Sequence, residues 1–486
     1  MKWMFNPLLS RIGNVCYLFA VIQLLPLSYA LVIREPIAEA YGYLASILLS
    51  TAVGALFSFL GRANDTKENK GHGYVSSALT AIVIVIVASA PYIFNGDLSL
   101  NKAIFESASG LSTTGITTYT DVSLLPKSLL LYRGLTQWFG GALFIAYFMM
   151  VGFKSEDQIM LGYSSALMNL KLPKKINNVY KGVITFMALY FVLTVVQTVI
   201  MFALGLPVFE AFTNTLSIVS TGGFATHSNG LEGVFNQQGI NTSSVQYVLS
   251  ALMILSGLGY YVFLRLANKD FKGVSRDTEL RTFGVFLLTG VVVTFGVLIS
   301  KGLVVADGFS EIVFWVTSSL STYGVYNNAY MVIPEMVIIA LILGAIGGMM
   351  GSVSSGIKVY RTNILGKSVG YEVDQIFKPS HELTLMKLNG KTINTRIILK
   401  LSIFMLTWAI IAILGFFLIM LVSDLDGSVA FSSVIGAMAN GGVINPVFLS
   451  YNNMNGSALY IYSLLMVIGR LEIIPFLVMF RRSAWK

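Results

Sequence analysis

The stretch FESASGLSTTG, residues 105–115, is too short and too polar to cross a bilayer, and it ends in two threonines and a glycine. Three similar stretches follow it along the chain: FTNTLSIVSTG at 212–222, FWVTSSLSTYG at 314–324 and FSSVIGAMANG at 431–441. In all four, a phenylalanine precedes the final glycine by ten residues. Repetition at a nearly regular interval indicates an architecture of repeated units. The sequence therefore predicts four related units in one chain.

The composition places the chain in a membrane. Of its 486 residues, 55% are hydrophobic and only 11% are charged, and the mean hydropathy is +0.75. These values exclude an ordinary soluble enzyme. The net charge of +9 does not indicate a nucleic-acid partner, because the basic residues lie in short loops between apolar runs. We therefore expect membrane lipid around the chain and no nucleic acid bound to it.

Residues that commonly carry catalysis or bind metals are scarce. The single cysteine, Cys16, lies inside an apolar run, and the three histidines, His72, His227 and His381, are far apart. The sequence contains no phosphate-binding loop, nucleotide fingerprint or zinc-ligand spacing. We therefore expect a protein that is not an enzyme, with no catalytic residue and no organic cofactor.

Apolar runs long enough to cross about 30 Å of hydrocarbon give the order of the predicted spans. Residues 15–33 and 41–60 form two leading spans, and no cleavage pattern follows residues 1–11, so the first span is expected to remain. Each unit then adds a span, a short half-buried segment and a second span. The second spans are expected at 129–153, 245–266, 331–350 and 458–480.

These elements predict an all-α integral membrane protein of about ten spans, in which two extra helices precede four parallel repeats around one pore. The predicted boundaries are 1–73 for the leading helices and 74–181, 182–281, 282–395 and 396–486 for the four pore repeats.

The distribution of charge predicts the orientation. Basic residues collect in 61–73, at Arg481 and Arg482, and in the linkers, which include Lys171, Lys174, Lys175, Lys358, Arg361 and Lys378. These loops and both termini are therefore expected on the cytoplasmic side. The opposite loops carry mainly acids, namely Asp97, Glu106, Asp121, Glu210, Glu232, Asp307, Glu311, Asp424 and Asp426. Either the acids form an ordinary solvated rim, or together they form a negative outer mouth that concentrates cations.

The repeated segment has the properties of an ion filter. Non-helical backbone at membrane depth is tolerated only where protein or a water-filled cavity satisfies it. Four half-helices that return as extended chain would aim free carbonyl groups at one point, where they can replace the hydration shell of a monovalent cation. Glycine is needed because a Cβ would obstruct that backbone. Alternatively the glycines only let re-entrant helices pack closely, but four copies with one spacing favour the filter.

The segments STTGIT, VSTGGF, STYGVY and ANGGVINP resemble the Trk/Ktr/HKT superfamily of potassium transporters. The run LPKSLLLYRGLTQWFGG after the first copy and GRLEIIPFLVMF in the last span share this resemblance. The two leading spans are most similar to the bacterial TrkH branch. The resemblance implies K⁺ uptake across the bacterial cytoplasmic (inner) membrane, with K⁺ as the transported ion.

The resemblance also implies which backbone carbonyls bind K⁺. They belong to Thr113, Thr114 and Gly115; Ser220, Thr221 and Gly222; Thr322, Tyr323 and Gly324; and Ala439, Asn440 and Gly441. The third and fourth copies depart from the Ser/Thr-rich pattern of the first two, but all four keep the glycine. Four glycines are typical of the K⁺-preferring members, whereas a serine in the first copy is typical of members that take Na⁺.

The third unit contains a glycine-rich run near the end of its second span. The glycines are Gly344, Gly347, Gly348, Gly351 and Gly356. Each interior glycine costs a helix about 1 kcal/mol relative to alanine, so we expect the helix to break or hinge here. A close-packing helix face is the alternative. The resemblance favours an intramembrane loop that lies under the filter as a gate.

Arg470 lies in the middle of the last predicted span, two residues before Glu472. A charge at this depth is costly and faces protein or water. Arg470 is either a structural residue bonded to carbonyls of a neighbouring span or, as the resemblance implies, a cationic barrier anchored to the glycine-rich loop. Glu472 is a poor partner for it on a continuous helix, because the two lie on different faces. Arg133 is expected to brace the first pore helix.

The resemblance further implies a homodimer and a cytosolic nucleotide-binding regulatory subunit of the TrkA type. It leaves open whether K⁺ passes through an ion channel or by symport with H⁺ or Na⁺, and whether Na⁺ is also taken. A secondary transporter of an organic solute is a less favoured alternative, because it would need inverted repeats and a polar site at the midplane. A membrane enzyme would need acid–base or metal-binding groups clustered at one depth.

Overall fold

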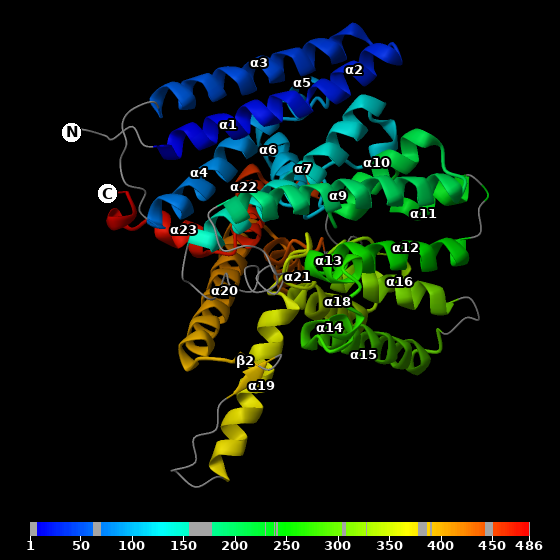
Figure 1. The fold of residues 1–486 in the computed structure, drawn as a ribbon. Coiled ribbons are helices and arrows are strands. Elements are labelled where there is room, and N and C mark those ends of the chain that lie inside the picture. The colour runs from blue at the N-terminus through cyan, green and yellow to red at the C-terminus, as the bar shows by residue number, and fades with distance from the viewer. Residues whose placement is uncertain are drawn as a thin grey trace.

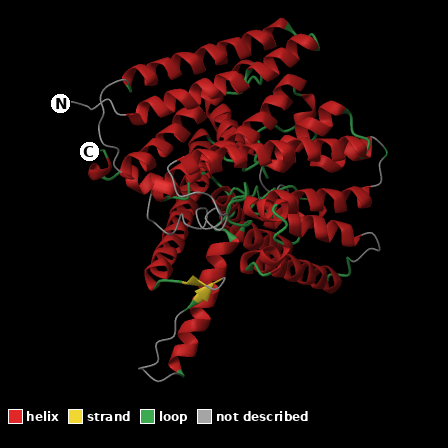
Figure 2. Cartoon of the chain, in the orientation of Figure 1, coloured by secondary structure: helices red, strands yellow, loops and turns green. Residues whose placement is uncertain are grey.

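The computed structural model describes residues 7–61, 70–154, 177–228, 230–237, 239, 242–303, 308–326, 328–377, 386–388, 391–442 and 451–485. Several charged residues named above lie outside these ranges, namely Lys171, Lys174, Lys175, Asp307, Lys378 and His381. Within the ranges, the chain is helical apart from loops and one antiparallel pair of strands, β1 (Lys387–Leu388) and β2 (Lys391–Thr392) (Figure 2). The predicted all-helical membrane fold class is confirmed.

Two leading helical segments lie side by side, coloured blue in Figure 1. The first consists of α1 (Pro7–Ile22) and α2 (Leu24–Val32), and the second is α3 (Ile37–Leu60). They pack closely at Gly13, where a Cβ would lie within 3.0 Å of the Gly54 carbonyl oxygen and of Ser58. Small residues at such a crossing allow helices to approach each other in a membrane, where hydrophobicity alone does not drive them together.

Each of the four units that follow contains a long helix, a short helix and a further helix. The first unit has α4 (Lys70–Ala88), α5 (Ala90–Phe94), α6 (Leu100–Leu111), η1 (Val122–Leu124) and α7 (Lys127–Lys154). The second has α9 (Asn177–Ala203), α10 (Val208–Val219), α11 (Gly230–Gln237), α12 (Thr242–Gly257), α13 (Tyr260–Ala267) and α14 (Phe271–Ser275).

The third unit has α15 (Thr278–Ser300), α16 (Gly308–Leu320), α17 (Asn328–Met331), α18 (Pro334–Ile346) and α19 (Val359–Ile376). The fourth has α20 (Thr395–Val422), α21 (Gly427–Ala439), η2 (Tyr451–Asn453), α22 (Gly456–Arg470), α23 (Ile474–Met479) and η3 (Arg482–Ala484). The short helices α6, α10, α16 and α21 have 12 or 13 residues. At 1.5 Å per residue they rise only about 20 Å, which is too little to cross the hydrocarbon.

Six helical segments in the described ranges are long and apolar enough to span a membrane. They are Leu9–Val32, Ile37–Leu60, Gly71–Phe94, Gly182–Ala203, Thr278–Ser300 and Thr395–Val422. A seventh is possible if the bent pair Ser243–Gly257 and Tyr260–Ala267 forms one span. Both predicted leading spans and the first span of every unit are among the six. The total of ten stays a prediction.

Three of the second spans are broken: the break in the third unit was expected at its glycines, whereas those in the second and fourth units were not. The pair α12 and α13 is bent by 93° at Leu258 and Gly259. The helix α18 ends at Ile346, where Gly347 turns the chain with φ 73°. The helix α22 ends at Arg470, because Glu472 and Ile473 have φ values of 59° and 65°. Positive φ cannot continue a right-handed helix.

The segment after the glycine-rich run was expected to be a basic cytoplasmic linker. It contains α19, which protrudes from the rest of the molecule beside the β-hairpin (Figure 1). Leu388 of the hairpin and Leu401 of α20 pack with Ile364 of α19 in a small hydrophobic cluster. The first turn of this region is not solvated: Lys358 and Arg361 are only 3% and 1% exposed. Lys358 and Arg361 were expected among the basic residues of this linker, but the structure buries both side chains in the protein at the start of α19.

Candidate functional site

After each short helix, one residue has the same uncommon backbone conformation. Thr113, Thr221, Thr322 and Asn440 are left-handed, with φ of 56°, 52°, 60° and 50°. Two residues later comes a glycine of positive φ, namely Gly115, Gly223, Gly324 and Gly442. Left-handed backbone is uncommon in any residue other than glycine and is an outlier in a β-branched one. Its recurrence makes the four segments structurally equivalent.

This equivalence corrects the register predicted from the equal spacing. Gly115 and Gly324 take the same position, but their counterparts are Gly223 and Gly442 rather than Gly222 and Gly441. The hydrogen bonds agree, because the amide N–H groups of Thr114, Gly222, Tyr323 and Gly441 all donate to a carbonyl five residues earlier. The double glycines in STGG and ANGG were the signal for the second glycine.

The phenylalanines that gave the equal spacing are not equivalent either. Phe105 and Phe314 are buried, whereas Phe212 is 36% exposed and Phe431 49% exposed. The structure therefore places the phenylalanines of the second and fourth segments one position earlier on their helices, on an outward face. The ten-residue spacing is constant because, in the second and fourth segments, the phenylalanine and the glycine that were counted both lie one position before the equivalent positions of the other two segments.

The four segments close a ring in chain order. A Cβ on Gly115 would lie within 3.0 Å of the Gly222 carbonyl oxygen, and one on Gly223 would lie equally close to the Tyr323 oxygen. Gly324 stands in the same relation to Gly441, and Gly442 to Thr114. Each glycine thus faces the carbonyl of the next segment. Only glycine fits, because no space remains for a side chain and the backbone has positive φ.

Side chains of α7 and of the fourth segment itself hold these segments in place. Gln137 of α7 donates from Nε2 to the Gly222 carbonyl at 2.7 Å and accepts from the Phe224 N–H at 3.2 Å. Asn440 donates from Nδ2 to Oγ1 of Thr114 at 2.9 Å and to the Met466 carbonyl at 2.8 Å. The second bond ties the fourth segment to α22, and the first ties it to the first segment.

The first short helix is braced by a buried ion pair. Glu106 of α6 lies 3.6 Å from Arg133 of α7, and the two side chains are 0% and 2% exposed. Glu106 also accepts hydrogen bonds from Thr117 and from Thr118. The predicted bracing role of Arg133 is confirmed. The placement of Glu106 at an outer mouth was wrong, because its charge is neutralised inside the protein.

The glycine-rich run forms a buried, non-helical loop between α18 and α19, which we call the intramembrane loop, residues 347–358. All of its residues are buried except Gly356. The predicted break is confirmed, and it begins at Gly347; Gly344 still lies in α18. Gly347, Gly351 and Gly356 all have positive φ. The loop touches the third of the four segments, because the Ser355 N–H donates to Oγ1 of Thr322 at 2.9 Å.

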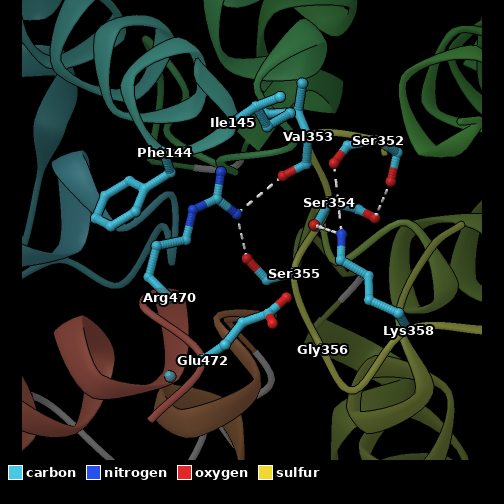
Figure 3. A pocket seen from close by; sticks show the side chains of 11 residues that line it. Phe144, Ile145, Ser352, Val353, Ser354, Ser355, Gly356, Lys358, Arg470 and Glu472 are labelled. Carbon is cyan, nitrogen blue, oxygen red and sulfur yellow. Dashed lines mark hydrogen bonds between the residues drawn. The ribbon is translucent and has the colours of Figure 1, made fainter. Parts of the chain in front are cut away.

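Arg470 reaches the intramembrane loop from α22 (Figure 3). Its Nη1 donates to the Val353 carbonyl at 2.8 Å and to Oγ of Ser355. Its guanidinium lies 5.4 Å from the centre of the Phe144 ring. Glu472 pairs instead with Arg361 of α19, as the sequence argument against an Arg470–Glu472 pair required. Arg470 is therefore anchored to the loop.

Comparisons with known proteins give a consistent result. The TrkH family, described as "Cation transport protein", matches residues 43–485. The chain is 28% identical to the Trk system potassium uptake protein TrkH of Salmonella typhimurium, over 99% of both chains. It is 26% identical to the Trk system potassium uptake protein TrkG of Escherichia coli, over 98% of this chain and 97% of that one.

The fold is also similar to that of a solved structure, the potassium transporter TrkH from Vibrio parahaemolyticus. The two superpose with a TM-score of 0.86 at 23% sequence identity, over 99% of this chain and all of the other. At this identity the similarity concerns the fold.

Proposed function

Because the chain belongs to the TrkH family of cation transport proteins, we propose that it takes up K⁺ across the cytoplasmic membrane, through a four-glycine filter gated by the intramembrane loop and Arg470. The predicted resemblance to the Trk/Ktr/HKT superfamily is confirmed. The curated relatives are named as potassium uptake proteins rather than as enzymes.

The ring of four glycines is the observation that carries the proposal. Each glycine faces the carbonyl group of the next segment, so four glycines and four carbonyl groups alternate around one closed ring with no side chain between them. Carbonyl oxygens in such an arrangement can replace the hydration shell of K⁺. The proposed filter consists of residues 113–115, 220–223, 322–324 and 439–442, and the four units, bounded as predicted, form the pore repeats.

The intramembrane loop supplies the proposed gate. Its tip contacts both the filter, through Thr322, and the guanidinium of Arg470. A fixed positive charge beneath a cation filter opposes the passage of K⁺, since charges in a low-dielectric interior are only weakly screened. Movement of the loop would carry its tip away from Arg470 and open the path.

The proposal extends to orientation and partners. We propose that both termini lie in the cytoplasm, together with α19 and the basic linkers, because the basic residues follow the positive-inside distribution. The name of the relatives, "Trk system potassium uptake protein", supports further components of such a system. From the resemblance to the Trk/Ktr/HKT superfamily we propose that one is a cytosolic nucleotide-binding subunit of the TrkA type and that the chain forms a homodimer. The protruding α19 offers that subunit a contact connected directly to the intramembrane loop.

Growth at low K⁺ tests the transport role. A bacterium deficient in K⁺ uptake is given the native chain, a Gly115→Ser variant, or a Gly296→Ser control, since a Cβ added to Gly296 in α15 would meet no atom within 4 Å. We expect rescue by the native chain and the control, and weakened preference for K⁺ over Na⁺ in Gly115→Ser. No rescue by native chain present in the membrane, with a TrkA-type partner supplied, would overturn the proposal.

A further inference from the structure

The ends of the intramembrane loop are fastened by backbone hydrogen bonds. The N–H groups of Ile357 and Lys358 donate at 2.8 Å to the carbonyls of Ala345 and Ile346, which end α18. Gly347 and Gly356 cross there, too close for a Cβ on either. These bonds satisfy carbonyl groups at the end of α18 that have no hydrogen-bond partner within the helix, and so stabilise the crossing. The loop can therefore change shape mainly at its tip, residues 351–355.

Two cationic side chains bind the loop tip at alternate residues (Figure 3). Arg470 binds the Val353 carbonyl and the Ser355 hydroxyl. Lys358 donates from Nζ to the Ser352 carbonyl at 3.4 Å and to the Ser354 carbonyl. The loop tip is thus held by one cationic side chain from α22 and by another from the last residue of the loop itself.

The backbone of Lys358 directs its side chain toward the tip. Lys358 precedes α19 with φ 82°, a conformation that a lysine rarely adopts. Its side chain lines the same small cavity as Arg470 and Glu472, of about 20 Å³, and is not directed into solvent along α19. An ammonium group is strongly hydrated, so its burial here requires the carbonyls that it binds.

We propose that Lys358 is a second gating residue, whose ammonium group holds the loop tip in the closed position and adds a second positive charge beneath the filter. This inference rests on the proposed K⁺ transport and names a further residue of the same gate. Opening of the gate then requires the loop tip to break its hydrogen bonds to two cationic side chains, Arg470 and Lys358. Lys358 is a positioning residue, since it acts on the filter through the loop.

A purely structural role for Lys358, as an anchor for the start of α19, makes a different prediction. Loss of an anchor would lower the amount of folded protein and leave the flux per folded molecule unchanged or reduced. Loss of a residue that holds the loop tip in the closed position would instead raise the maximal K⁺ flux. The K⁺ concentration for half-maximal flux would stay the same, because the filter is not altered.

The experiment measures K⁺ flux into liposomes that contain the purified full chain. It compares the unmodified chain with Lys358→Met, Lys358→Arg and Arg470→Ala. Lys367→Met is the matched control, because Lys367 is exposed on the same helix. We expect Lys358→Met to raise the maximal flux at least about tenfold, because the loss of even one charge-assisted hydrogen bond from a closed state has this effect and Lys358 donates two. Lys358→Arg keeps the charge and donors and should stay close to the unmodified chain.

The results separate this inference from the proposed function. Raised flux in Arg470→Ala with unchanged or lower flux in Lys358→Met overturns the role of Lys358 alone. An absence of K⁺ flux from every variant overturns the transport proposal itself. If Lys358→Met does not fold, Lys358→Gln replaces it, since glutamine is too short to reach both carbonyls and has no charge. Unchanged flux in that variant equally overturns the inference.

Discussion

Ser355 in the intramembrane loop donates its backbone N–H to Oγ1 of Thr322 in the third filter segment, at 2.9 Å. This bond joins the two parts of the proposed transport path directly. Thr322 has left-handed backbone, as do its counterparts in the other three segments. Among these four residues, Thr322 has a side chain that accepts a hydrogen bond from the loop. A movement of the loop would therefore act directly on the third segment.

Thr322→Val removes this acceptor and keeps the side-chain shape. We expect K⁺ flux to rise roughly fivefold, because a neutral hydrogen bond contributes about 1 kcal/mol to the closed state. Flux into liposomes measures the effect, and Thr322→Ser should restore the native value. Thr215→Val in α10 is the control, since that buried hydroxyl has no partner among the described residues. Equal flux in Thr322→Val and the native chain would contradict the coupling.

Arg470→Ala removes the guanidinium from the loop tip. Because the variant loses both the positive charge beneath the filter and the bond to the Val353 carbonyl, we expect higher K⁺ flux. The increase should exceed that of Thr322→Val, since bonds from charged donors contribute about twice as much as neutral ones. Arg482→Ala, at an exposed arginine near the C-terminus, is the control. Unchanged flux in well-folded Arg470→Ala would refute the barrier role.

Gly223→Ala and Gly222→Ala test the register of the second segment. A Cβ on Gly223 would meet the Tyr323 carbonyl, on a backbone with φ 82°. The three atoms nearest to a Cβ on Gly222 all belong to the end of the Gln137 side chain, which can move. We therefore expect Gly223→Ala to reduce K⁺ uptake at least about tenfold, because backbone cannot yield as a side chain can. A larger loss in Gly222→Ala would show that the assigned equivalence is wrong.

Arg133→Met tests the brace on α6. It leaves Glu106 charged and buried without its cation, which costs about 3–5 kcal/mol in comparable pairs. Thermal unfolding in detergent should therefore show a clear loss of stability. The comparison is Lys301→Met, which breaks the 2.7 Å pair with Glu335, where both side chains are 44% exposed. We expect a much smaller loss there, since water screens exposed pairs; similar losses in the two variants would contradict the argument.

Hydrophobic runs predicted the membrane class, the leading helices and the first span of each unit. This succeeded because the thickness of a bilayer imposes a length that can be counted along the chain. The four filter segments were found for a similar reason, since glycine and threonine recur where the backbone requires them. The sequence analysis did not identify Gly223 and Gly442 as the counterparts of Gly115 and Gly324. The number of residues between a phenylalanine and a glycine carries no information about the φ angle of that glycine.

The sequence by itself determined that this chain lies in a membrane, that it consists of four related units and that the third unit breaks at its glycines. Only the tertiary structure decided which charges are buried: Glu106 with Arg133, Arg361 with Glu472, and Lys358 folded back over its own loop. Local sequence encodes hydrophobicity and backbone preference over a few residues. The partner of a buried charge depends instead on how the chain folds back on itself, over a few residues at Lys358 and Ser354 and over more than a hundred at Arg470 and Val353.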